Sequence, residues 1–97
     1  MIGGIGMALM EHAVVDARNA RVPNANLAEY ALPVHADTPP TMEVIFVPEE
    51  DPHVNPLEAK GIGELSMVGV APAIANAGFR ATGKRIRELP ITPDKLL

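Results

Sequence analysis

The sequence of 97 residues predicts a single α+β domain, residues 1–97, with two to three helices and a few short strands. An apolar segment rich in Ala, Leu and Met, residues 5–15, favours a helix. The β-branched run Met42–Val47, bounded by prolines, favours a strand. A chain of this length forms at most one domain, which buries only about 60 to 65% of the surface that its unfolded form exposes.

The predicted first helix, residues 5–15, is apolar around most of its circumference, and a helix of this kind is buried on several sides. Residues 16–23 form a connector, and residues 24–34 are weakly patterned and close at a proline. After the strand Met42–Val47, the proline-rich and acidic residues 48–56 predict an irregular, solvated loop.

The last third of the chain is predicted to be helical in two pieces, because Pro72 removes a backbone donor and interrupts a continuous helix. The second piece runs from about Pro72 to Thr82 and stops at Gly83. Residues 85–89 can form a short strand, and Thr92 can cap a final helical turn. One face of the second piece carries small side chains that predict close packing against other backbone: Ile74, Ala77, Gly78 and Ala81.

Charge and composition exclude several classes of function. The net charge of −4 arises from 12 acidic and 8 basic residues spread along the chain, so no cationic stripe is available and nucleic-acid binding is disfavoured. The absence of cysteine excludes disulfides, thiolate zinc sites and iron–sulfur ligation by this chain.

The apolar opening, residues 1–10, is too short to cross a bilayer and lacks the basic start of a signal peptide. This predicts a soluble protein, cytoplasmic or periplasmic, with no membrane partner. Such an opening is typical of the interior of a longer protein.

The step Gly61-Ile62-Gly63-Glu64 is the most informative candidate site. Two glycines two positions apart permit positive φ angles and close approach of the backbone to a ligand, and an acidic residue follows at the start of a predicted helix. The structural alternative is a glycine turn in which Glu64 interacts with the helix N-terminus, and the local pattern alone favours it. Lys60 can supply a charge to a phosphate or remain a solvated surface lysine.

No metal site is predicted in this chain. The three histidines, His12, His35 and His53, lack the spacing of metal ligands. The acidic run Glu49–Asp51 lacks the ligand spacing and the glycine of a calcium loop, and it is interpreted as a solvated turn. Ser66 is the only serine and lacks the nucleophile-elbow pattern, which argues against a serine hydrolase.

The order of five segments is more specific than any one of them: residues 3–9, 24–30, 59–64, 71–77 and 89–96. Together they resemble the end of the molybdopterin-binding large subunit of the xanthine dehydrogenase/aldehyde oxidoreductase family, the molybdenum hydroxylases, over essentially all 97 residues. The resemblance is strongest to bacterial three-subunit aldehyde oxidoreductases. It implies that the chain is a C-terminal fragment of the large-subunit domain that binds the molybdenum cofactor.

By this resemblance, Glu64 is the catalytic general base, and Lys60, Gly61, Ile62 and Gly63 contact molybdenum–molybdopterin cytosine dinucleotide. The implied reaction is the oxidation of aldehydes or N-heterocycles by water-derived hydroxylation, with electrons leaving through iron–sulfur and FAD-binding subunits. The remaining cofactor and substrate contacts then lie in the rest of the large subunit. The isolated chain is therefore expected to be inactive and not to retain the cofactor.

Two other classes of function remain open from the sequence. The chain can be a small non-catalytic interaction module that keeps the ancestral fold and binds partner subunits, or itself as a homo-oligomer, through its apolar first helix. It can also be an independent small enzyme that uses Glu64 as its base. The last alternative is the weakest, because no companion nucleophile, metal site or cofactor cradle is visible.

Overall fold

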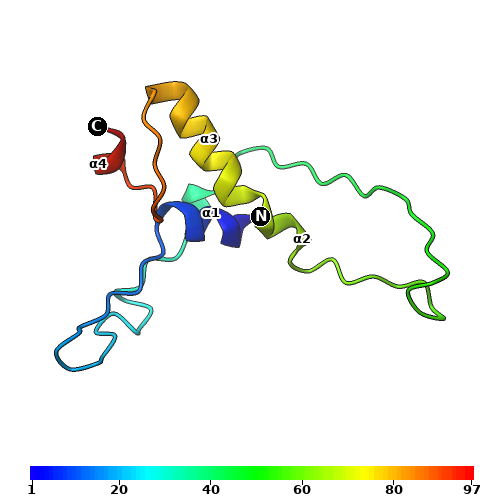
Figure 1. Cartoon of the computed structure of the whole chain (residues 1–97), viewed down its shortest axis with the longest axis horizontal. Helices are drawn as coiled ribbons and strands as arrows, with labels where there is room; N and C mark the ends of the chain where they lie inside the picture. Colours follow the sequence, from blue (N-terminus) through cyan, green and yellow to red (C-terminus); the bar gives the residue numbers. More distant parts are fainter.

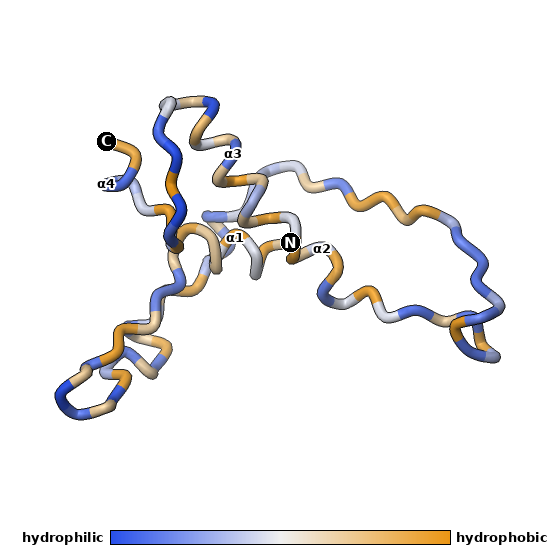
Figure 2. The backbone as a smooth tube through the Cα atoms, viewed as in Figure 1, coloured by the Kyte–Doolittle hydropathy of each residue, from blue (hydrophilic) through white to orange (hydrophobic).

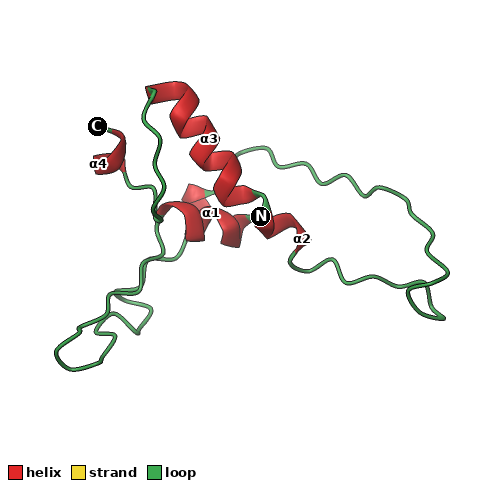
Figure 3. Cartoon of the chain, viewed as in Figure 1, coloured by secondary structure: helices red, strands yellow, loops and turns green.

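Short helices separated by long irregular excursions make up the computed structural model, which describes all 97 residues (Figure 1). In chain order the elements are α1 (Ile2–Leu9), the 3-10 turn η1 (His35–Asp37), α2 (Leu65–Val68), α3 (Val70–Thr82) and α4 (Pro93–Leu96). Figure 3 shows no strand, and the only strand-like pairing is an isolated antiparallel bridge between Asp16 and Arg21. The prediction is confirmed for its helices, whereas the strands predicted at residues 42–47 and 85–89 are wrong for this chain, because neither segment has a partner strand.

The first helix is shorter and begins earlier than predicted, at Ile2–Leu9 instead of residues 5–15. Beyond its end, the side chain of Asn24 competes for backbone groups that a longer helix would use. The amide of Val14 donates to Asn24 Oδ1 at 3.0 Å, and Asn24 Nδ2 donates to the carbonyl of His12 at 2.6 Å. The two β-branched residues that end the predicted span also disfavour helix. These contacts hold the chain extended after α1.

The second helical region follows the prediction of two pieces, but the break falls at Gly69 and not at Pro72. Pro72 lies in the first turn of α3, where a backbone amide has no partner within the helix to lose. The predicted stop is confirmed: Gly83 adopts a left-handed φ of 75°, and its amide donates to the carbonyl of Phe79 at 2.8 Å. The final turn, α4, begins after Thr92 as predicted, although the threonine side chain makes no capping hydrogen bond.

Helix α1 packs against α3 at a glycine. A Cβ atom built on Gly4 would lie 2.8 Å from the Cβ of Val70, so only glycine permits this approach. At Gly78, on the predicted small-residue face of α3, no backbone approaches closely, since a Cβ atom built there would meet only the side chain of Leu96, at 3.5 Å. The glycine that permits the close approach of the two helices is therefore Gly4 of α1. The C-terminal segment closes the same cluster, since the amide of Ile91 donates to the carbonyl of Ala8 at 2.6 Å.

The core of the chain is very small. Its five buried residues are Gly4, Gly6, Ala8, Pro90 and Ile91. The accessible surface is 8012 Å², whereas a compact monomer of this mass exposes about 5,400 Å². The radius of gyration of 17.5 Å likewise exceeds the roughly 13 Å of a compact domain of this length.

The additional surface belongs to two excursions, residues 10–34 and residues 39–64, which extend away from the helices in different directions (Figure 1). Figure 2 shows apolar stretches along both of them. Leu27, Ile45, Val47 and Leu57 are each more than four-fifths exposed, at 83%, 83%, 81% and 86%. Monomeric soluble proteins rarely expose apolar surface on this scale.

We expect Gly4→Ala to destabilise the packing of α1 on α3 by about 1–3 kcal/mol, the usual cost of overpacking. The new methyl group would meet Val70 Cβ, which is attached directly to the backbone and cannot rotate away. Gly3→Ala is the matched control, because its Cβ would meet only the end of the Met67 side chain at 3.6 Å, while alanine gains up to about 1 kcal/mol in helix propensity. Urea unfolding followed by circular dichroism checks both variants. Equal midpoints for the two variants would contradict the close approach at Gly4.

Candidate functional site

The predicted site residues lie on the returning arm of the second excursion, where the chain runs extended into α2. In an extended chain successive side chains point to opposite sides. Lys60 and Ile62 accordingly line one groove, and Gly61 and Gly63 line a separate hollow. Glu64 also lines the hollow, because the chain turns at residues 63–64 and the alternation ends there. The five residues are contiguous in sequence, yet they present two different faces.

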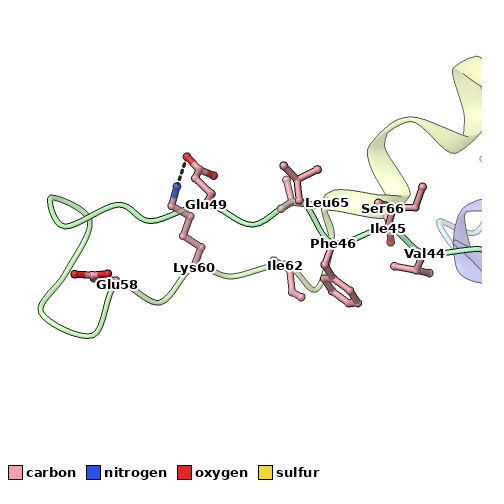
Figure 4. A pocket seen from close by; sticks show the side chains of 10 residues that line it. Val44, Ile45, Phe46, Glu49, Glu58, Lys60, Ile62, Leu65 and Ser66 are labelled. Carbon is pink, nitrogen blue, oxygen red and sulfur yellow. Dashed lines mark ion pairs between the residues drawn. The ribbon is translucent and has the colours of Figure 1, made fainter.

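The groove on the Lys60 side lies between the two arms of the excursion, and Figure 4 shows its lining side chains. The outgoing arm contributes four apolar residues, Val44 to Val47, and the returning arm contributes Lys60 and Ile62. The ammonium group of Lys60 bridges the arms: its Nζ lies 2.8 Å from Glu49 Oε1 and 3.3 Å from Asp51 Oδ2. These ion pairs are the polar connection between the two arms.

The side chain of Lys60 is 34% exposed, so it is neither fully solvated nor buried. Its hydrogen bond to the Glu49 carboxylate raises the pKa of the ammonium group above its ordinary value, and the hydrogen bond to Asp51 adds to this effect. Lys60 is therefore cationic throughout the neutral range. An ammonium group has three donor hydrogens, so two carboxylate partners leave one for a further acceptor.

The hollow on the other side is lined by Gly61, Gly63, Glu64, Leu65 and Val68. The positive φ angles that the two glycines permit are not used, since Gly83 is the only glycine with a positive φ. A Cβ atom built on Gly61 or Gly63 would meet nothing within 4 Å. The fold of this chain therefore imposes no conformational or steric need for glycine at either position. What remains is an open stretch of backbone that a ligand can approach closely.

Glu64 is the residue that immediately precedes α2, with backbone angles φ −106° and ψ −11°. Its side chain is exposed and makes no capping hydrogen bond to the helix. None of the ion pairs of the chain involves it, because they join Arg18 to Asp16 and Lys60 to Glu49 and Asp51. The geometry of a structural cap is thus absent, and the carboxylate is left free at the edge of the hollow.

No group of three or more histidine, cysteine or carboxylate side chains is arranged to hold a metal ion. None of the helices combines the length and apolar composition that a membrane crossing requires.

Glu49 and Asp51 are parts of the site region that the sequence interpretation missed, since it assigned them to a solvated acidic turn. In the structure they are the partners of Lys60. The sequence contained an indication of these ion pairs. Acidic residues and a lysine flank a proline-rich turn, and this turn brings the two arms of the excursion side by side. Charge complementarity across such a turn predicts an ion pair.

The chain thus combines a small core and exposed apolar excursions with an exposed carboxylate, that of Glu64, beside two glycines in an open hollow. No family model matches the chain. Across all 97 residues it is 53% identical to the aldehyde oxidoreductase molybdenum-binding subunit PaoC of Escherichia coli (strain K12), of which it covers 13%. It is 41% identical over 93 residues, 96% of the chain, to the putative xanthine dehydrogenase molybdenum-binding subunit XdhA of the same organism, of which it covers 12%.

The aldehyde oxidoreductase of Megalodesulfovibrio gigas is a more distant relative, 35% identical over 94 residues, which are 97% of the chain and 10% of that protein. The chain belongs to this family of molybdenum-binding oxidoreductase subunits. It spans between 10% and 13% of the length of these relatives, so it is a fragment by comparison with them. The family resemblance of the five sequence segments is thereby confirmed.

Proposed function

We propose that this chain is the C-terminal portion of the large subunit of a molybdenum hydroxylase, which oxidises aldehydes or N-heterocycles by water-derived hydroxylation. The observation that carries the proposal is the free carboxylate of Glu64 beside the open backbone of Gly61 and Gly63. This arrangement occurs in a chain that is similar over its whole length to a molybdenum-binding aldehyde oxidoreductase subunit. An aldehyde, as the name of that relative indicates, is the first substrate class to test.

Glu64 acts in this proposal as the general base. A base must reach the proton that it removes, and the exposed carboxylate is not held by any hydrogen bond to α2 or by an ion pair. The molybdenum cofactor, when bound, supplies the centre that accepts the two electrons of the substrate. Glu64 takes up the proton released from the water-derived hydroxyl as its oxygen adds to the substrate carbon. The position of the carboxylate at the rim of the hollow leaves it accessible from that side.

The proposed cofactor, molybdopterin cytosine dinucleotide, fits the exposed backbone next to Glu64. Because nothing lies within 4 Å of the positions that side chains at Gly61 and Gly63 would occupy, a bulky ligand can approach the backbone there. Ile62 faces the other side, into the apolar groove, and would fix the orientation of the loop. Lys60 remains cationic and has one donor hydrogen beyond its two ion pairs, so it can contribute to holding a cofactor phosphate.

The proposed partners follow from the size of the chain. The remainder of the large subunit supplies the other cofactor and substrate contacts. In this proposal iron–sulfur and FAD-binding subunits carry the electrons away, and this chain, which contains no cysteine, supplies no thiolate ligand for a cluster. The exposed apolar excursions provide surface for contact with at least the first of these partners.

We expect the isolated chain, produced in a host that makes the cofactor, to contain molybdenum far below one atom per chain, because one loop supplies only a few of the necessary contacts. The complete large subunit that includes it should hold the metal stoichiometrically and oxidise aldehydes together with its partner subunits. Inductively coupled plasma mass spectrometry of both preparations makes the comparison. Stoichiometric molybdenum in the isolated chain would contradict the assignment as a fragment of the site.

The second candidate, a non-catalytic interaction module, is favoured by the exposed apolar side chains alone. It predicts a solitary gene, whereas the enzyme proposal predicts that the coding sequence for the rest of the subunit lies directly upstream in the same direction. The genomic neighbourhood therefore separates the two candidates without any biochemical measurement.

A further inference from the structure

The segment Met42–Val47 is an extended chain without any backbone partner. Between residues 40 and 50 no amide or carbonyl group takes part in a backbone hydrogen bond. Prolines at positions 39, 40 and 48 border the segment and limit any regular structure to the residues between them. Unpaired amides and carbonyls along an extended backbone are the groups that join a strand to the edge of a β-sheet.

Within this segment, residues 44–47 are apolar on both faces, whereas Glu43 is charged. The exposed fractions are 60% for Val44, 83% for Ile45, 72% for Phe46 and 81% for Val47. A strand with one face in water alternates apolar and polar residues, whereas a strand covered on both faces is continuously apolar and β-branched. The composition of residues 44–47 is of the second kind, and Figure 2 shows the same apolar stretch on the outgoing arm.

The sheet that this segment fits cannot come from the chain itself, because the chain contains no strand. The opposite arm lies across an apolar groove and offers Lys60 and Ile62 as side chains, but no β-pairing. The chain covers 13% of the length of the relative PaoC, so most of the corresponding subunit is polypeptide outside this structure. The remaining part of the same subunit is therefore the polypeptide with the capacity to provide a sheet edge and a cover for both faces.

We infer that residues 41–47 add as a strand to the edge of a β-sheet in the remainder of the large subunit, with both faces of residues 44–47 covered there. The inference rests on the proposed place of this chain in a larger subunit, but not on the role of Glu64. Docking has a consequence for the candidate site, because the ion pairs of Lys60 with Glu49 and Asp51 tie the returning arm to the docked arm. A strand held in a sheet would thus fix the position of the loop at residues 60–64.

Hydrogen–deuterium exchange with mass spectrometry tests the inference in the complete subunit and in the isolated chain. We expect the amides of residues 41–47 to exchange at least about a hundredfold more slowly in the complete subunit, as in a stable ladder. Equal exchange in the two preparations would overturn the inference. Protection that arises in the isolated chain and increases with its concentration would also overturn it, because the partner would then be a second copy.

Substitutions on the two faces distinguish a covered strand from a surface contact. Val44→Lys and Ile45→Lys, on opposite faces, should each abolish most of the protection, whereas Glu50→Lys, just beyond the segment, should not. Loss of protection with only one of the two lysines would indicate one-sided contact and contradict the inference. The exchange measurement does not depend on turnover, so its outcome is independent of whether Glu64 is the base.

Infrared spectroscopy can identify the secondary structure that residues 41–47 adopt in the assembled subunit. The chain contains only two phenylalanines, Phe46 and Phe79, so an isotope label on phenylalanine reports on this segment and on one helix. Chain labelled with carbonyl-¹³C phenylalanine and assembled with the separately produced remainder should show a strand-type infrared band from Phe46 beside the helical band of Phe79 in α3. A helical band alone would contradict strand addition. If the two pieces do not assemble, the exchange experiment on the complete subunit decides by itself.

Discussion

Glu64→Gln in the complete enzyme is expected to reduce turnover by at least about 10²- to 10⁴-fold, the contribution typical of general acid–base catalysis. Glutamine preserves the size and hydrogen-bonding capacity of the side chain but cannot accept a proton. Because the Glu64 side chain neither caps α2 nor forms an ion pair, the replacement should leave folding and molybdenum content unchanged. The loss should therefore fall on kcat and on kcat/KM together.

Glu50→Gln is the matched control for this prediction, since Glu50 is an exposed carboxylate in the same excursion and takes part in no ion pair. Steady-state oxidation of an aldehyde and of an N-heterocycle should be measured for both variants, alongside their molybdenum content. Near-normal turnover of the Glu64 variant with both substrates would show that Glu64 is not the base. Loss of molybdenum in this variant would assign it to cofactor binding instead.

Glu64→Gln should lose turnover and keep the cofactor. Gly61→Val and Gly63→Val are expected instead to lose most of the bound cofactor while the fold of the chain is unchanged. Nothing in this chain lies within 4 Å of either new Cβ, and neither glycine has a positive φ, so the chain itself accommodates a side chain at both positions. A β-branched side chain would nevertheless keep the backbone away from a ligand in the hollow. Molybdenum content and thermal unfolding of the complete subunit measure the two effects separately.

Gly69→Val provides the control, because Gly69 also has no atom within 4 Å of its Cβ position but does not line the hollow. It should retain the cofactor and the fold, since the helix propensity of valine is no lower than that of glycine. Normal molybdenum content in both loop variants would exclude close backbone approach to the cofactor at Gly61 and Gly63. Taken with the Glu64 variant, these results separate the proton acceptor from the surface that holds the cofactor.

The helix boundaries that could be predicted are those set by local chemistry. Gly83 ends α3 because a left-handed residue is needed there, and glycine adopts that conformation without steric cost. Pro93 at the start of α4 uses a position where no helical amide is required. The break predicted at Pro72 falls instead at Gly69, because Pro72 lies in the first turn of α3 and removes no helical hydrogen bond. Each of these rules involves residues within one or two turns, so the sequence alone contains the necessary information.

The predictions that failed depend on groups that are distant in sequence. The first helix stops before the predicted end because Asn24 takes the backbone groups of residues 12 and 14. Residues 42–47 have the composition of a strand, but strand formation requires a neighbouring backbone that this chain does not provide. The glycines of the site region indicate where the backbone is accessible, yet their φ angles could not be inferred from their spacing.

By itself, the sequence determined the family, the order of the helices, two of their ends and the position of Glu64 directly before a helix, because these depend on residue identity and local spacing. Only the tertiary structure decided that Gly4 is the contact between α1 and α3, and that Lys60 is held by Glu49 and Asp51. It also decided that the contiguous residues 60–64 divide between a groove and a hollow. Such features arise from chain segments brought together by folding, and their distances are not encoded in any one of those segments.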